Sequence, residues 1–268
     1  MKGLKKIALV SAIAAAPFAA QADMLALDDA AMGTVTGQAG VTIELQTKVS
    51  IGEFLYTDEG QFSVKGITIG GGAVERDASG AVTGVSGLLD DVKVDIDVLA
   101  DGDAVIQVKS VSGAPVDFAV AVESASLQGT DAAGDSTLLA SNIGIQGLLG
   151  GINMSVDTAT DSLNAVVLFT VTDMDMDVDF LAVGIRDLTV RGANFNPADP
   201  YSLFAVANVT MSKAANVRAA SGEALKIDVA TFAADVAIGA IEIGGTSIGS
   251  VALNDLVISD TTMQIYGH

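Results

Sequence analysis

From residue 41 onward, apolar and polar residues alternate along the chain with a period of two. The alternation is clearest at residues 41–45, 92–98 and 165–171, where aliphatic residues occupy every second position. Successive side chains of a β-strand point to opposite faces, so this pattern is typical of a sheet with one apolar and one polar face. Many of the apolar residues are β-branched, which also favours strands over helices. The pattern predicts an all-β protein.

Short polar segments that separate these runs predict hairpin turns. Residues 57–60 (TDEG), 100–103 (ADGD) and 157–162 (DTATDS) contain the Asp, Gly, Ser and Thr residues that turns favour. Turns spaced by about eight to twelve residues predict about fourteen to sixteen antiparallel strands. We expect a long antiparallel meander that forms a curved sheet or a flattened sandwich. A β-solenoid is the alternative, because many runs end in glycine.

Few segments depart from the strand pattern after residue 22. Residues 25–32 (LALDDAAM) predict a short helix, and residues 23–40 as a whole predict that helix followed by a turn. The glycine-rich residues 70–84 predict a loop. We expect residues 41–268 to form a single all-β domain, and residues 193–200 (ANFNPADP) mark the boundary if this region has two sub-domains.

The first 22 residues have the features of a secretory signal peptide. Three lysines precede an apolar run, and Ala20-Gln21-Ala22 has the small-x-small form that precedes a cleavage site. The run is too short for a membrane-spanning helix, and no later segment predicts such a helix. We therefore expect cleavage after Ala22 and export to the periplasm, the outer-membrane surface or the extracellular space.

Acidic residues outnumber basic residues by 33 to 13 in the 268-residue chain, and loss of the first 22 residues lowers the net charge from −20 to −23. Such a surface lacks the cationic patch that nucleic-acid binding requires, so this function is excluded. Cysteine is absent, which excludes disulfides, thiolate catalysis and cysteine-ligated zinc.

Catalytic motifs are equally absent from the sequence. The one histidine is His268, the last residue, and no nucleophile elbow, zinc-protease helix or phosphate-binding loop occurs. We predict a protein that is not an enzyme, without catalytic residues and without an organic cofactor.

The segment TDMDMDVDF, residues 172–180, places four aspartates at alternate positions. On a strand these aspartates share one face at about 6.5–7 Å spacing. Calcium takes six to eight oxygen ligands, more than neighbouring aspartates on one face can direct at one point. We interpret the segment as a strand with a solvated acidic face. Repulsion among so many carboxylates predicts that salt or calcium raises thermal stability.

Two other acidic segments have shapes better suited to an ion. Asp101 and Asp103 flank Gly102, and Asp131 and Asp135 flank a short small-residue segment. Neither has the ligand spacing of an EF-hand loop. These four residues form the metal hypothesis, and calcium is the only cofactor that we consider.

Residues 27–60 contain an acidic segment LDDAAM, then VTGQAG at 35–40, a β run, and a YTD turn at 56–58. This arrangement resembles the N-terminal signature of FilA-like pilus-system proteins of Gram-negative bacteria, and the closing IYGH resembles the ends of related exported proteins. The resemblance implies export and a surface or pilus-linked setting. We interpret Thr36, Gly37, Gln38 and Gly40 as a turn that leads into the first strand, in which Gly37 and Gly40 take positive φ angles. A recognition role in secretion or assembly is the alternative.

Three functions are consistent with these features. The first is a structural or adhesive surface protein that acts through its sheet, with copies of itself or other surface or pilus proteins as partners. An alternative is a carrier that holds a lipid acyl chain in a groove of a curved sheet. A second alternative is a surface module that calcium stabilises.

Overall fold

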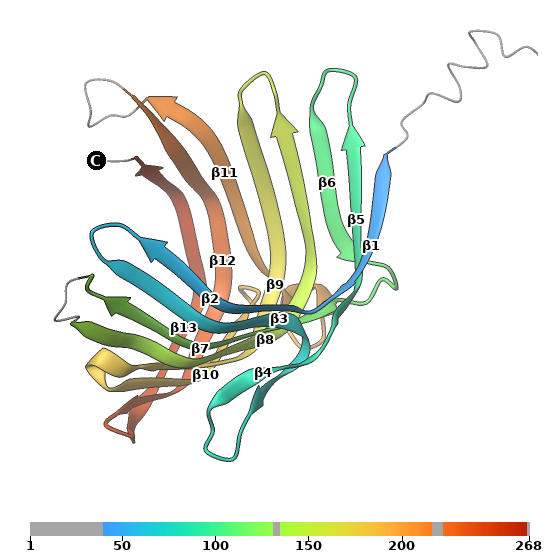
Figure 1. The fold of residues 1–268 in the computed structure, drawn as a ribbon. Coiled ribbons are helices and arrows are strands. Elements are labelled where there is room, and N and C mark those ends of the chain that lie inside the picture. The colour runs from blue at the N-terminus through green and yellow to red at the C-terminus, as the bar shows by residue number, and fades with distance from the viewer. Residues whose placement is uncertain (1–39, 131–134, 216–221, 267–268) are drawn as a thin grey trace, which may run out of the picture. The chain divides into compact units, whose positions relative to one another are not determined.

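The computed structural model describes residues 40–130, 135–215 and 222–266, and most of these residues lie in β-strands (Figure 1). The predicted signal segment, the helix at 25–32 and most of the turn at 35–40 lie outside this range. The described elements, in chain order, are β1 Val41–Thr47, β2 Val49–Thr57, β3 Gln61–Arg76, β4 Val82–Gly87, β5 Leu89–Val98, β6 Ala104–Ser110, β7 Val116–Gln128, β8 Ser136–Asp157, β9 Ser162–Val178, the 3-10 helix η2 Asp179–Leu181, β10 Val183–Arg191, the 3-10 helix η3 Pro200–Leu203, β11 Ala205–Ala215, β12 Glu223–Ile243 and β13 Thr246–Ile265.

All pairings between these thirteen strands are antiparallel. The predicted all-β class and antiparallel sheet are therefore confirmed, and the parallel stacking of a β-solenoid does not occur among the described residues. The strands are slightly fewer than predicted because several are very long. β8 and β12 have 22 and 21 residues, and β8 continues through Gly147, where a run was expected to end.

The sheet has two arms that share the long strands β8, β9, β12 and β13. The strand order of the first arm is β1-β5-β6-β8-β9-β11-β12-β13, and that of the second arm is β2-β3-β7-β8-β9-β10-β12-β13. Each shared strand contributes one half to each arm. β9, for example, pairs with β11 through residues 162–169 and with β10 through residues 171–178.

The shared strands curve where one arm passes into the other, as Figure 1 shows for β8 and β9. The register between these two strands shifts around Gly147 and again around Gly151. A Cβ atom at Gly147 would collide with the carbonyl of Thr170 on β9, so only glycine allows this close approach. Bulges of this kind bend a strand and increase its twist.

Two small apolar clusters stabilise the sheet, one of them at this junction. Alanine and valine residues from four strands pack there against partly buried phenylalanines. The buried members are Val171, Val190, Ala205 and Ala234. In the other cluster, Val82 and Val85 of β4 pack against Ala119 and Ala121 of β7. The described core is thus built from small aliphatic residues.

The loop predicted at residues 70–84 is wrong. β3 continues to Arg76 and β4 begins at Val82, so only residues 77–81 form the turn between them. Gly70 and Gly71 are needed for another reason, because a Cβ at either position would collide with the carbonyl of Gly87 or Leu88. These glycines allow β4 to approach β3 closely.

Contacts between Cα atoms divide the chain into one unit at Met1–Ala39 and a second at Gly40–His268. Residues 193–200, considered above as a sub-domain boundary, lie inside the second unit and connect β10 to η3 and β11. Within the described residues, no helix has the length and apolar composition needed to cross a bilayer.

Candidate functional site

Among the described residues, β1, β2 and β13 lie at the two ends of the strand order, and each pairs with a neighbour on one side only. The short strand β4 also pairs on one side only, with β3, but it lies off this order and packs against β7. Lys48 alone separates β1 from β2, so these strands form one continuous edge, which we call the N-terminal edge (residues 41–57). The opposite edge is β13, which we call the C-terminal edge (residues 246–265). Each edge runs through both arms and leaves one row of backbone N–H and C=O groups without a partner strand.

Exposed apolar side chains are concentrated on these edges. Of 25 exposed large hydrophobic residues in the described part of the chain, fifteen belong to the two edges, although the edges hold only about a sixth of the described residues. The fifteen are Val41, Ile43, Leu45, Val49, Ile51, Phe54, Leu55, Tyr56, Ile248, Val251, Leu253, Val257, Ile258, Met263 and Ile265. Single exposed apolar residues are ordinary on protein surfaces, but a contiguous set indicates an interaction surface.

The edges also lack most of the features that protect natural sheets from pairing. Natural edges are short, carry lysine or proline, or are covered. Neither edge contains proline, and their one lysine, Lys48, donates to the carbonyl of Val85. Their acids are Glu44 and Glu53 on one edge and Asp255 and Asp260 on the other. Bulges in the pairing of β1 with β5 and of β13 with β12 are the remaining protection.

Residues 172–178 of the aspartate-rich segment form the end of β9, as predicted, whereas Asp179 and Phe180 lie in η2. The acidic face of this strand is not simply solvated. Asp173, Asp175 and Asp177 are half-buried. Arg186 of β10 contacts Asp177 at 2.5 Å and Glu242 of β12 at 3.1 Å. A second arginine, Arg76 at the end of β3, contacts Asp175 at 3.2 Å. Two of the aspartates therefore hold neighbouring strands together through ion pairs.

These surroundings change the acidity of two carboxyl groups in opposite directions. Burial raises the pKa of Asp177, but hydrogen bonds from Asn142 and Arg186 outweigh burial and leave that pKa below its usual value. Burial also raises the pKa of Asp173, and the charges of Asp175 and Asp187 raise it further. The ionised form of Asp173 is thus disfavoured in the folded protein.

Asp173, Asp175 and Asp187 also form a candidate ligand group for a cation. Their carboxylates lie within 4.8 Å of one another, the one such group of three found among the described residues. Carboxylate oxygens suit calcium. However, Asp175 already accepts the backbone N–H of Asp187 at 2.9 Å and pairs with Arg76. These contacts explain the arrangement of the group without an ion.

The three described residues of the metal hypothesis are not brought together. Asp103 accepts the N–H of Thr158 at 2.9 Å and its hydroxyl at 3.0 Å, and Asp101 accepts the N–H of Asp103 at 3.1 Å. These bonds join the β5–β6 turn to the β8–β9 turn. Asp135 precedes the opposite end of β8, and Asp131 lies outside the described residues. No described metal-ligand group includes Asp101, Asp103 or Asp135.

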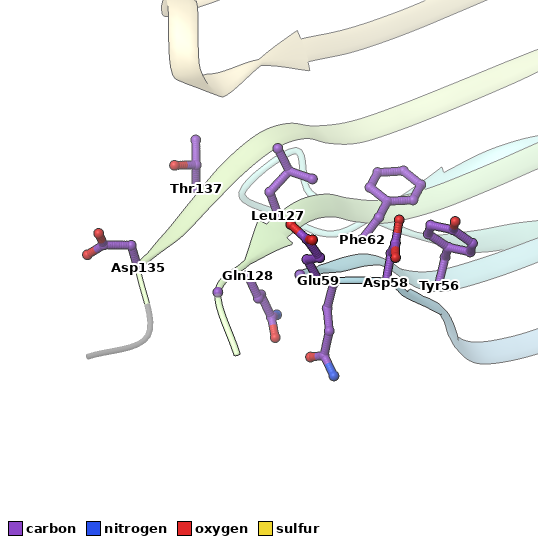
Figure 2. A pocket seen from close by; sticks show the side chains of 11 residues that line it. Tyr56, Asp58, Glu59, Phe62, Leu127, Gln128, Asp135 and Thr137 are labelled. Carbon is purple, nitrogen blue, oxygen red and sulfur yellow. The ribbon is translucent and has the colours of Figure 1, made fainter. Parts of the chain in front are cut away.

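Asp135 instead lines an open hollow of about 700 Å³ at the end of the second arm (Figure 2). The hollow lies between the β2–β3 turn and the ends of β7 and β8, and its labelled side chains include Tyr56, Phe62 and Glu59. A more apolar hollow of about 350 Å³, lined in part by Val166 and Leu168, is also open to solvent. Neither encloses an acyl chain, so the carrier function stays a prediction.

Gly40 is the one residue of the predicted recognition turn that the structure describes. Its φ angle is not positive. A Cβ atom at this position would collide with the carboxylate of Asp97 on β5. Gly40 is therefore explained by close packing at the start of β1, and the positive φ angle expected there is wrong. Thr36, Gly37 and Gln38 lie outside the described residues.

A family model matches residues 1–100. It describes a family of unknown function, DUF6160. No curated protein and no solved structure matches the chain. The DUF6160 match includes the N-terminal edge and continues beyond β5, so the similar region covers the strands from β1 to β5 but not β13.

The sequence analysis did not predict that several Asp and Asn residues adopt unusual backbone conformations inside the strands. Asp91, Asn142, Asp187, Asp255 and Asp260 lie within strands yet have positive φ angles, which Asp and Asn tolerate better than other non-glycine residues. Carboxylates on the neighbouring strands stabilise the backbone at two of these positions through hydrogen bonds. The N–H of Asp187 donates to Asp175, as described above, and that of Asp255 donates to Asp235 at 2.7 Å. The signal in the sequence is a polar residue that interrupts the two-residue period.

Proposed function

We propose that this chain is an exported, non-catalytic structural protein of the bacterial surface that assembles through the open edges of its sheet. Its partners are copies of itself or other surface or pilus proteins. The observation that carries the proposal is the concentration of exposed apolar side chains on two long edges with unpaired backbone groups. Addition of a strand to such an edge gives affinity through main-chain hydrogen bonds and specificity through side chains.

The energetics of edge pairing favour association. Full burial of a Val, Leu, Ile or Phe side chain contributes about 1.5–3 kcal/mol, and edge residues that are about half exposed would contribute roughly half as much. The fifteen apolar residues of the two edges together therefore supply on the order of 10–20 kcal/mol. Association costs about 4–15 kcal/mol in lost translational and rotational freedom, so the hydrophobic gain and this cost are comparable, and the backbone ladder adds to the gain.

Light scattering of the purified chain over a wide concentration range, together with electron microscopy, tests the proposal. We expect oligomers or fibres that grow with protein concentration. The net charge of −23 after loss of the first 22 residues opposes association, so salt should promote assembly by screening. A chain that stays monomeric at high concentration in both low and physiological salt would refute the function.

Export is tested separately by the mass of the protein after expression in a Gram-negative host. The features of residues 1–22 support cleavage after Ala22, so the exported protein should begin at Asp23. Recovery of the uncleaved chain from the cytoplasm would contradict export. This result is independent of whether the purified protein assembles.

A further inference from the structure

We infer that the C-terminal edge of one copy pairs with the N-terminal edge of the next copy, so that the chain assembles head to tail as an open series. The inference rests on the proposed function and specifies its partner and its interface. A head-to-tail contact joins two different surfaces, leaves one edge free at each end, and therefore continues without limit unless a rotation closes it.

The number of strands in each arm permits this continuation. Each arm contains eight strands in an all-antiparallel order, as described above. With an even number of strands, the first and last strands run in opposite directions. A second copy in the same orientation therefore presents β13 antiparallel to the N-terminal edge of the first copy. The antiparallel ladder can continue across the contact without any rearrangement.

The halves of the two edges also correspond. Residues 246–253 of β13 pair with the part of β12 that belongs to the second arm, and β2 belongs to that arm. Residues 256–265 pair with the first-arm part of β12, and β1 belongs to the first arm. In an antiparallel contact, each half of β13 therefore faces the matching half of the N-terminal edge.

Each edge passes from one arm of the sheet to the other near its middle. The transition lies at Lys48 between β1 and β2, and at the bulge of Asp255 in β13. Head-to-tail pairing aligns these two positions, so both arms continue at once. Lys48 is the one basic residue on either edge, and this alignment places it near the Asp255 of the neighbouring copy.

Pairing of an edge with its own copy is less favourable. If two C-terminal edges pair antiparallel with Asp255 at the centre of the contact, the Asp255 residues of the two copies come close to each other. The equivalent contact of two N-terminal edges, centred on Lys48, brings Lys48 toward the Lys48 of the other copy. Like charges directly opposite each other destabilise a sheet. Each of these contacts also leaves the other apolar edge of both copies exposed.

Two variants, each with two substitutions, distinguish head-to-tail pairing from the pairing of an edge with its own copy. Ile51→Lys with Leu55→Lys blocks the N-terminal edge, and Val251→Lys with Val257→Lys blocks the C-terminal edge. Each pair should weaken its contact at least about tenfold. The control is Val98→Lys with Leu138→Lys, which places lysines at exposed apolar sites outside the edges. Mass photometry then gives the size of each species, and circular dichroism checks that each variant keeps its sheet.

The expected result is a monomer for each blocked variant alone and a dimer, but nothing larger, for their equimolar mixture. The control should assemble like the unmodified chain. Dimers of either blocked variant alone would overturn the inference, because they require an edge to pair with itself. Assembly that both blocked variants retain in full would also overturn it. A monomeric unmodified chain would instead refute the proposed function.

Cross-linking gives a second measurement if a lysine variant does not fold. The chain has no cysteine, so Ser50→Cys and Asn254→Cys can each provide a single thiol on opposite edges. A short bismaleimide added under assembly conditions should join the two variants only to each other. Cross-linked dimers of one variant alone, or no product from the mixture, would overturn the head-to-tail contact.

Discussion

Arg186 joins three strands of the second arm, and its removal gives a quantitative test of the ion pairs described above. From β10, its guanidinium donates to the carbonyl of Met176 at 2.9 Å and to the carboxylate of Asp177 at 2.5 Å on β9. It also contacts Glu242 on β12 at 3.1 Å. Arg186→Ala would remove these contacts and leave two half-buried carboxylates without their main cation.

The expected loss follows from the geometry. A hydrogen bond to a charged group contributes about 1.5–3 kcal/mol, but the side chains of Arg186, Asp177 and Glu242 are 28–30% exposed, so solvent screens part of this. We expect the free energy of unfolding to fall by about 2–3 kcal/mol in total. For a domain of this size, each kcal/mol corresponds to about 2–4 °C, so the melting temperature should fall by roughly 5–10 °C.

Urea unfolding followed by circular dichroism measures this loss against a matched control. Lys213 and Glu223 form an ion pair at 2.7 Å, but their side chains are 59% and 66% exposed. Lys213→Ala should therefore lower stability much less than Arg186→Ala does, because solvent screens this exposed pair. If the unfolding midpoint of Arg186→Ala is no lower than that of Lys213→Ala, the cross-strand role of Arg186 is refuted.

The pH dependence gives a second criterion for the same variant. The pKa of Asp177 is lowered in the folded protein, so its ionised form stabilises the fold above the ordinary value of 3.8. This contribution is lost as the pH falls through the lower, folded-state pKa. The difference between the unmodified chain and Arg186→Ala should therefore be largest near pH 7 and shrink below pH 3.8. A difference that is constant with pH would contradict this reasoning.

Three further predictions concern other acids. Asp173→Asn should raise the free energy of unfolding at pH 7, because burial and the charges of Asp175 and Asp187 raise the pKa of Asp173 and so disfavour its ionised form; in urea unfolding this gain should disappear as the pH falls through that pKa. Sodium chloride or calcium chloride should raise the melting temperature by screening the carboxylates, and a melting temperature indifferent to both salts would refute this. Asp260 has a φ of 54°, so Asp260→Gly should be tolerated whereas Asp260→Val should cost about 1–2 kcal/mol in urea unfolding; equal effects would contradict a backbone role.

The local structure could be predicted from the sequence because its signals are local. The alternating runs at 41–45, 92–98 and 165–171 lie within β1, β5 and β9, and the turns at 100–103 and 157–162 join the expected strands. Pairings between distant strands could not be predicted. β1 pairs with β5, more than 40 residues later, and a two-residue period carries no information about which strand lies alongside.

The same limit applies to the candidate interface. Ile43 and Val94 lie in similar alternating runs and even pair with each other, yet Ile43 lies on an open edge and Val94 lies between two strands. Periodicity indicates which face a side chain occupies, but exposure at an edge depends on the order of strands in the sheet. The partners of Arg186 were missed for the same reason, because Asp177 and Glu242 come from strands on either side of it.

The four strands common to both arms also determine how the described unit can come apart. A conventional two-domain protein has a linker, so one domain can unfold while the other remains folded. Here β8, β9, β12 and β13 run through both arms. If these strands separate from their neighbours in one arm, the other arm also loses the support of the same strands. We expect hydrogen exchange to report cooperative opening of both arms, with independent fraying confined to hairpin tips.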